Sequence, residues 1–367
     1  MAPRVDPQAD LRFMREALAE AIPMVGRTSP NPAVGCLIVK EGRVVGRAAT
    51  AAGGRPHAEP QAIKMAGKRS ADATAYVTFE PCSHHGQTPP CADALIESGI
   101  KRAVIGCLDP YPPVRGRGVA KLRRAGIAVE VGLLEQECRR INEGFITRVT
   151  KRRPFVLLKM ALSLDGRIAA TQPDSGWISS EPSRELSHRW RNECDAVMVG
   201  AGTIMIDNPR LTCRLKGGRD PIRIVVDAAL RTSPQAHIYR LRSLAPTLLV
   251  TLPENLEKAN KLYKRRNVEI IAVRPAPEGI DIRAMMRELA ARGISKILLE
   301  GGAHLAAAVL HVKMVDRVAF FIAPKIFGAG TSAIEGLALN RVRDAIEVAN
   351  LRATQVGTDW LLEGEVS

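Results

Sequence analysis

Short apolar runs and helix-spaced apolar residues alternate along the first 150 residues of the chain. The first helix is predicted to begin near Asp10, an N-cap residue type, because apolar side chains then recur every three or four positions. A second helix is predicted to start near Pro56, with His57 and Glu59 in its first turn, and a longer one to run from about 134 to 148. Further helices are expected at 91–98 and 119–125, and strands at 34–39, 44–48, 75–79, 103–108 and 128–131.

The same alternation restarts after a basic, proline-terminated stretch at 150–154, which predicts a domain boundary there. Helix N-caps are predicted at Ser180 and Asp281, and Gly293 is expected to end the second of these helices. Strands are expected at 155–161, around Met198, at 222–226, 248–250 and 268–273, around Leu298, and finally at 317–323. Alternating strands and helices predict an α/β chain with largely parallel sheets and two domains, residues 1–150 and 151–367.

The composition fits two folded domains and points to an anionic small-molecule ligand. Hydrophobic residues make up 46% and charged residues 25% of the 367 positions, as in ordinary globular proteins. The net charge of +15 favours anionic partners, but dispersed basic residues and an aromatic content of 4% favour a phosphorylated small molecule over nucleic acid. A polar N-terminus, no apolar run of membrane-spanning length and seven scattered cysteines predict a cytoplasmic chain with reduced thiols and no membrane partner. We also expect a homo-oligomer.

Three short segments in the first half together supply the ligands of a catalytic zinc site. They contain His57, Cys82 and Cys91, and a catalytic zinc ion takes three such ligands and leaves the fourth position to water. Glu59 lies two residues after His57, where it can act as the proton carrier without binding the metal. This arrangement is typical of hydrolytic deaminases that act on a nucleobase-like ring.

The spacing of the two cysteines leaves other interpretations open. Eight residues separate Cys82 from Cys91, whereas the usual deaminase signature has two between its cysteines. Since this longer loop contains His84 and His85, a closed structural zinc site with four ligands is an alternative. Buried cysteines without any metal are a third possibility. A structural zinc site needs no proton carrier, so it does not explain a glutamate beside the histidine ligand. The catalytic interpretation is therefore favoured.

Both halves of the chain contain distinctive sequence motifs. In the first half these are TSPNPAVG at 28–35, PHAE at 56–59 and EPCSHHGQTPPC at 80–91, and in the second half KMALSLDGR at 159–167, SGWI at 175–178, DNPRLTCR at 207–214 and EGG at 300–302. Together these motifs resemble those of the bifunctional riboflavin-biosynthesis deaminase–reductase family. The resemblance implies a cytidine-deaminase-like αβα domain followed by a dihydrofolate-reductase-like α/β domain. It also implies two cofactors, Zn²⁺ and NADPH.

The resemblance further implies two consecutive reactions on phosphorylated pyrimidines. The first removes the ring 2-amino group of 2,5-diamino-6-ribosylamino-4(3H)-pyrimidinone 5′-phosphate as ammonia. The second uses NADPH to reduce the ribosyl chain of 5-amino-6-(5-phosphoribosylamino)uracil to ribityl. The chain departs from the family pattern at Tyr111, where asparagine is usual, and at 48–54, which lacks an aromatic residue often found there. Both departures concern the rim of the first site.

Sites in the second half follow partly from chemistry and partly from the resemblance. Gly301 and Gly302 turn a strand into a helix and could cradle a phosphate, although a plain strand-to-helix turn is the alternative. Lys159 and Glu300 are candidates for holding the opened sugar and managing its proton. Arg191 and Arg214 are candidates for binding the 5′-phosphate of the substrate, because guanidinium groups bind phosphate oxygens in pairs. By resemblance, Ser175, Leu211 and Glu300, with Asn31 of the first half, are also predicted to bind substrate. The residues predicted by resemblance to bind the cofactor are Leu162, Trp177, Thr203, Asp207, Gly302, Ala303, His304, Leu305, Ala306, Ala307 and Ala308.

Two further functions compete with a bifunctional enzyme. One is a nucleic-acid deaminase whose basic second half binds RNA, which explains the charge but not the Glu300–Gly302 turn or the few aromatic residues. The other is a reductase whose first half is only a zinc-stabilised scaffold. That interpretation leaves Glu59 without a role.

Overall fold

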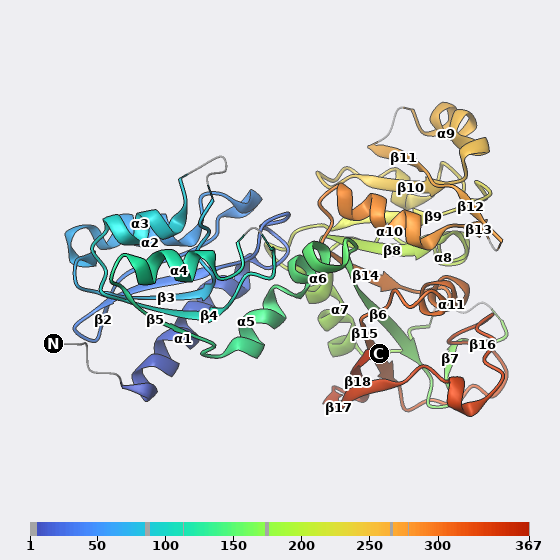
Figure 1. Cartoon of the computed structure of the whole chain (residues 1–367). Helices are drawn as coiled ribbons and strands as arrows, with labels where there is room; N and C mark the ends of the chain where they lie inside the picture. Colours follow the sequence, from blue (N-terminus) through green and yellow to red (C-terminus); the bar gives the residue numbers. More distant parts are fainter. Residues whose placement is uncertain are drawn as a thin grey trace. The chain divides into compact units, whose positions relative to one another are not determined.

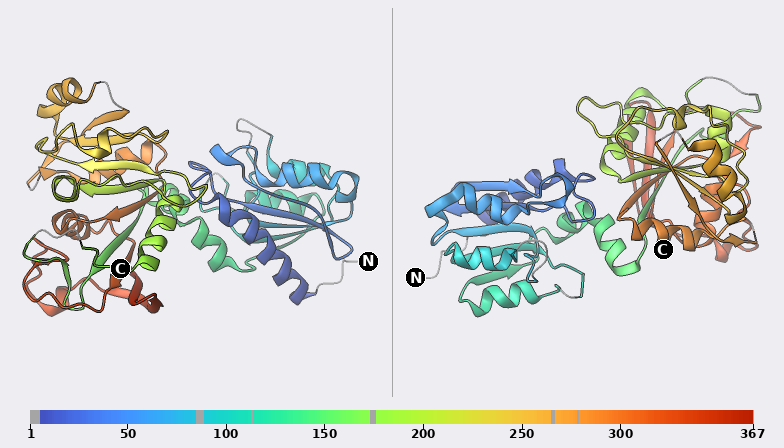
Figure 2. Two further views of the ribbon diagram at one scale, coloured as in Figure 1. Left: turned by 180° about the vertical axis from the view of Figure 1, so that it is seen from behind. Right: turned by 90° about the horizontal axis from the view of Figure 1, so that it is seen from above.

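The protein consists of two compact units, Met1–Arg153 and Pro154–Ser367 (Figures 1 and 2). The structure is a computed structural model that describes residues 6–84, 89–112, 114–172, 176–264, 267–277 and 279–366. Each unit builds its own sheet and its own hydrophobic core.

The first unit is a five-stranded sheet with helices on both faces, in the order β2-β1-β3-β4-β5. Helices α1 and α5 pack together on one face, while α2, α3 and α4 follow one another on the other. The helices are α1 (Pro7–Ala21), α2 (Ala58–Ala66), α3 (Cys91–Glu97), α4 (Arg117–Arg124), α5 (Glu135–Ile141) and α6 (Glu143–Lys151); the strands are β1 (Gly35–Lys40), β2 (Arg43–Ala49), β3 (Thr74–Phe79), β4 (Arg102–Cys107) and β5 (Ala128–Val131). Only β3, β4 and β5 are parallel, because β1 runs antiparallel to both β2 and β3.

The first helix begins earlier than predicted, and Asp10 is not its N-cap. Asp6 caps α1 by accepting hydrogen bonds from the amides of residues 8 and 9. Asp10 is buried inside the helix, where Arg102 of β4 binds both of its carboxylate oxygens at 2.8 and 2.6 Å. Tyr76 donates a further hydrogen bond to it at 2.6 Å. The pair therefore ties α1 to the sheet, which the local pattern of the helix could not show.

Replacing Asp10 with asparagine should destabilise the first unit by about 3–5 kcal/mol, because it leaves the buried guanidinium of Arg102 with only the exposed carboxylate of Glu130. The hydrogen bonds and charge of Arg102 lower the pKa of Asp10 below its ordinary value of 3.8. Because the pKa of Asp10 is lower in the folded than in the unfolded chain, its ionisation stabilises the fold, and this contribution is complete at pH values above 3.8. It disappears as the pH falls through the pKa of Asp10 in the folded protein. Urea unfolding at pH 7 and at pH 2–4 tests both points. The variant should lose less stability on acidification than the parent, and equal losses would contradict the assignment.

The long helix predicted near the end of the first unit is broken into α5 and α6. The break lies at Asn142, which the pattern had placed in mid-helix. Its buried amide accepts a hydrogen bond from the backbone N–H of Ala33 at 2.8 Å and donates one to the carbonyl of Ala33 at 3.0 Å. Asn142 thus fixes the segment that leads into β1, and this long-range contact decides the helix break.

The second unit is a nine-stranded sheet in the order β11-β10-β9-β8-β14-β6-β15-β18-β17. The first seven strands in this order, from β11 to β15, are parallel to one another, whereas β18 runs antiparallel to β15 and to β17. The strands are β6 (Phe155–Leu162), β8 (Ala196–Gly200), β9 (Ile222–Val226), β10 (Thr247–Thr251), β11 (Val268–Ala272), β14 (Lys296–Glu300), β15 (Arg317–Ile322), β17 (Val348–Val356) and β18 (Asp359–Val366); the helices are α7 (Glu181–Glu193), α8 (Ala201–Asp207), α9 (Leu256–Tyr263), α10 (Ile282–Ala291) and α11 (Ala303–His311). Short pairs are also formed by β7 (Arg167–Ala169) with β16 (Thr331–Ser332) and by β12 (Pro275–Ala276) with β13 (Gly279–Ile280).

The prediction that 317–323 is the last strand was wrong, because β17 and β18 follow it. Strand β17 is exposed along almost its whole length and therefore has no apolar periodicity to reveal it. The predicted helix starts at Ser180 and Asp281 are confirmed by α7 and α10, and the Asp281 carboxylate accepts the N–H of Ala284. Helices α8 and α9 were not predicted.

The middle of the second sheet is apolar on both faces, as expected for parallel strands under helices. Two charged side chains interrupt this apolar pattern, Lys159 within β6 and Glu300 at the end of β14. None of the helices in the described ranges is long and apolar enough to span a bilayer.

Candidate functional site

The three predicted zinc ligands come from two helix starts and one strand end. His57 is the N-cap of α2, one position before the first turn in which it was predicted, and Cys91 is the first residue of α3. Cys82 lies three residues after the end of β3. Because helix N-termini favour negative charge, this placement supports thiolates at the site.

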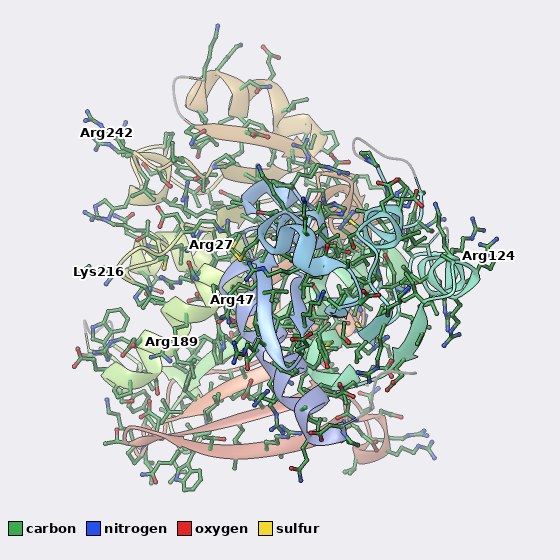
Figure 3. All side chains as sticks on the ribbon, turned by 90° about the vertical axis from the view of Figure 1, so that its left-hand side faces the viewer. Arg27, Arg47, Arg124, Arg189, Lys216 and Arg242 are labelled. Atoms are coloured by element: carbon green, nitrogen blue, oxygen red, sulfur yellow. The ribbon has the colours of Figure 1, made fainter. Side chains whose placement is uncertain are left out.

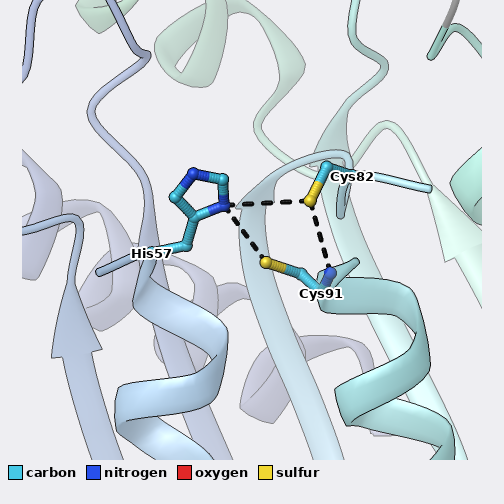
Figure 4. Close-up of side chains that lie close together, drawn as sticks. All are labelled: His57, Cys82 and Cys91. Carbon is cyan, nitrogen blue, oxygen red and sulfur yellow. Dashed lines mark hydrogen bonds between the residues drawn. The ribbon is translucent and has the colours of Figure 1, made fainter. Parts of the chain in front are cut away.

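The ligand atoms of the three residues converge on one point (Figure 4). The Nδ1 atom of His57 lies 3.2 Å from the sulfur of Cys91 and 3.8 Å from that of Cys82, and all ligand atoms lie within 4.8 Å of one another. Tetrahedral zinc with ordinary bond lengths would hold an imidazole nitrogen and a thiolate about 3.6 Å apart. The thiols are not joined in a disulfide, so the donor set fits a zinc ion.

No fourth protein ligand joins this group among the described residues. His84 is exposed and does not belong to the cluster, and His85 lies outside the described residues. Three protein ligands with one position left for water are characteristic of catalytic zinc sites, whereas structural sites are closed by four. The described geometry therefore favours the catalytic alternative.

Glu59 is buried in the first turn of α2 beside the ligand cluster. Burial together with the charge of Cys82 raises the pKa of its carboxyl group to about 7, and the interactions with His57 and Cys91 oppose this shift. It is not one of the residues whose atoms converge on the metal position. A buried, unligated carboxyl at this place can accept and return a proton.

Asn31 lies at the edge of the first site through its contact with the segment that carries His57. Its amide donates a hydrogen bond to the carbonyl of Gly54 at 2.9 Å, and Thr28 donates to the Asn31 carbonyl at 3.0 Å. Gly54 has φ +84°, and a Cβ there would come within 2.7 Å of the Asn31 amide. The contact therefore fixes the chain three residues before His57.

Two buried carboxylates near the first site were missed by the sequence interpretation. Glu80 accepts four backbone hydrogen bonds, and Asp109 accepts the N–H of Tyr111 at 2.8 Å. Burial, together with the charges of Glu80 and Cys82, raises the pKa of Asp109 to about 6, and the hydrogen bond from Tyr111 opposes this shift. The sequence contained one indication of Glu80, because it lies only two residues before Cys82, a predicted zinc ligand.

Lys159 and Glu300 face each other across neighbouring parallel strands. They are register partners in β6 and β14, so their side chains emerge on the same side of the sheet. Burial lowers the pKa of Lys159, and the negative charge of Glu300 opposes that shift. The structure thus brings together the two residues predicted to act on the opened sugar.

Arg191 of α7 is bound to Glu300 rather than free. Its Nε and one Nη donate to the two carboxylate oxygens at 2.6 and 2.8 Å, and its other Nη donates to the carbonyl of Thr212 at 3.1 Å. Although burial opposes ionisation of Glu300, the charge and hydrogen bonds of Arg191 lower its pKa to about 2. Arg214, the other predicted phosphate ligand, is exposed.

His188 is a further residue of this cluster that the sequence interpretation missed. Burial and the positive charges of Arg191 and Arg214 lower its pKa, while Glu300 and a hydrogen bond with the backbone of Thr212 oppose the shift. Its buried Nδ1 has no hydrogen-bond partner among the described residues. The available signal was its position three residues before Arg191, which places both on one face of α7.

The turn between β14 and α11 has the backbone expected of a phosphate cradle. Gly301 and Gly302 have φ +84° and +78°, and a Cβ on either would approach the Thr203 hydroxyl to 3.4 and 3.3 Å. No side chain caps α11, so its first amides remain available to an anion. These features fit the pyrophosphate of a dinucleotide cofactor.

The remaining residues predicted to bind the cofactor and substrate occupy varied environments. Leu162 is buried at the end of β6, Asp207 ends α8, and Trp177 is 64% exposed with the guanidinium of Arg184 5.1 Å from its ring centre. The side chain of Leu211 is buried in the core, so any ligand contact there would be through its backbone. Ser175 lies outside the described residues. Within α11, Ala303, Leu305, Ala306 and Ala307 are buried, Ala308 is partly buried, and His304 is exposed.

Comparisons with known proteins divide the chain in the same order as its two units. The family described as "Cytidine and deoxycytidylate deaminase zinc-binding region" matches residues 7–107, and the family described as "RibD C-terminal domain" matches residues 154–362. The second match alone covers more than half of the chain.

Full-length relatives share both units. The chain is 40% identical to the riboflavin biosynthesis protein RibD of Aquifex aeolicus over 97% of this chain and 98% of the relative. A solved deaminase/reductase of Thermotoga maritima is 38% identical, with a TM-score of 0.85 over 98% of this chain and 99% of that one. RibD of Acinetobacter baumannii is 31% identical, with a TM-score of 0.87 over 99% and 100% of the two chains. With its cytidine-deaminase-like first unit and its RibD reductase unit, this chain belongs to the RibD family of bifunctional, zinc- and NADPH-dependent enzymes of riboflavin biosynthesis.

Proposed function

We propose that the chain catalyses the two consecutive steps named above, first hydrolytic deamination of the diaminopyrimidinone ribotide and then reduction of its ribosyl chain. The observation that carries this proposal is the His57, Cys82 and Cys91 cluster with the buried, unligated Glu59 beside it. Support for the second step comes from Lys159 and Glu300, which are register partners on adjacent strands, and from the glycine turn before α11.

In the deaminase unit, His57, Cys82 and Cys91 would hold the zinc ion. When bound, the ion acts as a Lewis acid that makes water a stronger nucleophile near neutral pH. Glu59 takes the proton from the attacking water and delivers it to the departing amino group, which leaves as ammonia. Its burial beside the cluster keeps the carboxyl group close to both proton positions.

In the reductase unit, the first amides of α11 and the Gly301–Gly302 turn would bind the cofactor phosphates. NADPH, when bound, supplies the hydride for C1′ of the opened sugar. Lys159 donates a proton or hydrogen bond to the ring-opened sugar, and Glu300 holds Lys159 and the sugar in place. Arg191 keeps Glu300 ionised, and Arg214 is exposed where a substrate phosphate could reach it.

The proposal covers a phosphorylated small molecule as substrate, with no nucleic-acid partner, in a cytoplasmic homo-oligomer. Exposed cations labelled in Figure 3, including Arg47, Arg124, Arg189, Lys216 and Arg242, come from separate strands, helices and loops. Part of this charge is already paired, since Arg189 binds Glu185 at 2.8 Å. Such a distribution supports small-anion binding better than a nucleic-acid groove.

One assay tests both steps together. The purified chain is given the diaminopyrimidinone ribotide and NADPH, and ammonia and NADPH oxidation are followed in the same sample. We expect ammonia release to precede NADPH oxidation, with one NADPH oxidised for each ammonia formed. NADPH oxidation without ammonia would instead support a lone reductase on a zinc scaffold. Tight, salt-sensitive binding to generic RNA would favour the nucleic-acid alternative.

Removal of zinc should separate the two activities. Dialysis against a chelator is expected to abolish ammonia release, because the Lewis acid is lost. NADPH oxidation with the deaminated product as substrate should continue, since Lys159 and Glu300 belong to the other unit. Metal content by elemental analysis and recovery on addition of Zn²⁺ provide the check. Full ammonia release from protein shown to be metal-free would refute the zinc assignment.

A further inference from the structure

Glu80 is a buried carboxylate that no step of the proposed mechanism uses. It lies directly after β3 and two residues before Cys82, and it is as deeply buried as Glu59. Within the described part of the chain no basic side chain forms an ion pair with Glu80, and its carboxylate oxygens instead accept four backbone N–H groups. Backbone amides can stabilise a buried carboxylate, but they must be held in place to do so.

The four hydrogen bonds divide evenly between the two carboxylate oxygens. Oε2 accepts the N–H groups of Asp109 at 3.2 Å and Gly116 at 2.9 Å. Oε1 accepts those of Gly118 at 3.0 Å and Val119 at 3.2 Å, which belong to the first turn of α4. One side chain therefore holds both ends of the segment that joins β4 to α4.

The same contact brings this segment against the chain that carries Cys82. β3 and β4 are parallel neighbours, with Phe79 paired to Cys107, so the residues after both strands leave the same edge of the sheet. A Cβ on Gly118 would come within 2.1 Å of the Pro81 carbonyl oxygen. Asp109, held by Glu80, is buried and feels the charge of Cys82.

We propose that Glu80 is the positioning residue of the deaminase site, which fixes the β4–α4 segment, with Asp109, against the metal-ligand segment and so shapes the edge on which the pyrimidine is bound. The inference rests on the proposed deaminase function. Cys82 and Cys91 are also joined by other bonds, since the N–H of Cys91 donates to the Cys82 sulfur at 3.3 Å and that of Ala92 to the Cys82 carbonyl at 3.1 Å. Loss of Glu80 should therefore disturb substrate binding more than metal binding.

Two substitutions of Glu80 test whether the defect in substrate binding grows with the number of hydrogen bonds that are lost. Glu80→Gln keeps one acceptor oxygen and can satisfy only one pair of N–H groups, whereas Glu80→Ala satisfies none. We expect the KM for the diaminopyrimidinone ribotide to rise by roughly 10-fold in the first and 100-fold in the second, as for residues that orient a metal site from outside it. We expect kcat to change by less than about 3-fold and zinc to stay at one ion per chain. Gly118→Ala leaves Glu80 intact but places a methyl group against the Pro81 carbonyl, which should displace the start of α4. This variant should raise KM in the same way.

The matched control is Thr78→Val, two residues earlier in the same strand. Thr78 is fully buried and its hydroxyl accepts the Gly35 N–H at 3.0 Å, so the change removes a comparable bond but leaves the β4–α4 segment alone. Its KM should match the parent. Reductase activity of every variant reports on the intact second unit.

Two results would overturn the positioning role. One is an unchanged KM in Glu80→Ala; the other is a loss of zinc, or of active fraction, that accounts for the whole defect. If the parent chain itself released no ammonia, the proposed function would fail instead, so the two failures are distinguishable.

Discussion

Glu59→Gln is expected to lower ammonia release by roughly 10²–10⁴-fold, the usual contribution of a general acid–base group. Glutamine fills the same buried space but can neither take the proton of the attacking water nor hand it to the leaving amino group. The zinc ligands His57, Cys82 and Cys91 are untouched, so metal content should stay at one ion per chain. With the deaminated product as substrate, the variant should oxidise NADPH at the same rate as the unsubstituted protein. Ammonia release, bound zinc and NADPH oxidation are measured on one preparation.

The control for this substitution is Glu97→Gln at the end of α3. Glu97 is exposed and belongs to the same unit, so the change removes the same charge without touching the cluster. Its deaminase rate should be that of the parent. A Glu59→Gln variant that deaminates normally would remove the proposed acid–base role, and one that loses zinc would show that Glu59 instead supports the metal.

Glu300→Ala is expected to give the largest effect in the second unit. It leaves the buried guanidinium of Arg191 and the ammonium of Lys159 without their carboxylate, which should destabilise this unit by about 3–5 kcal/mol. Reductase turnover at saturating substrate should fall by roughly 10²–10³-fold, because a fixed charge at the reacting sugar is lost. Denaturant unfolding and NADPH oxidation at a temperature where the variant is folded measure the two effects. Normal turnover in both Glu300→Ala and Lys159→Ala would refute the assigned roles.

A double substitution separates structure from catalysis at this site. Replacing Arg191 with methionine and Glu300 with leucine exchanges the ion pair for apolar groups of similar size, which often costs little stability. We expect most of the lost unfolding free energy to return while turnover remains low. Recovery of turnover together with stability would mean that Glu300 only supports the fold.

The strand pattern of the chain could be predicted well because most strands are buried and strongly apolar. The errors lie where distant contacts decide. Asp10 resembles an N-cap in the local sequence, yet it is placed inside α1 to meet Arg102, which lies 92 residues away. Asn142 interrupts a helical pattern because its side-chain amide forms hydrogen bonds with the backbone of Ala33, 109 residues away. Strand β17 is held at the sheet edge by β18 and needs no apolar side of its own.

The candidate sites show the same division. The sequence by itself determined the chemistry, because His57, Glu59, Cys82 and Cys91 stand in short motifs whose residue types suit a zinc-dependent proton transfer. The tertiary structure alone decided which groups support that chemistry: Glu80 can be recognised only once β3 and β4 leave the same sheet edge, and the Arg191–Glu300 pair only once α7 packs beside the end of β14. The physical reason is that ligand type is a property of each side chain, whereas burial, pairing and hydrogen bonding depend on segments that only folding brings together.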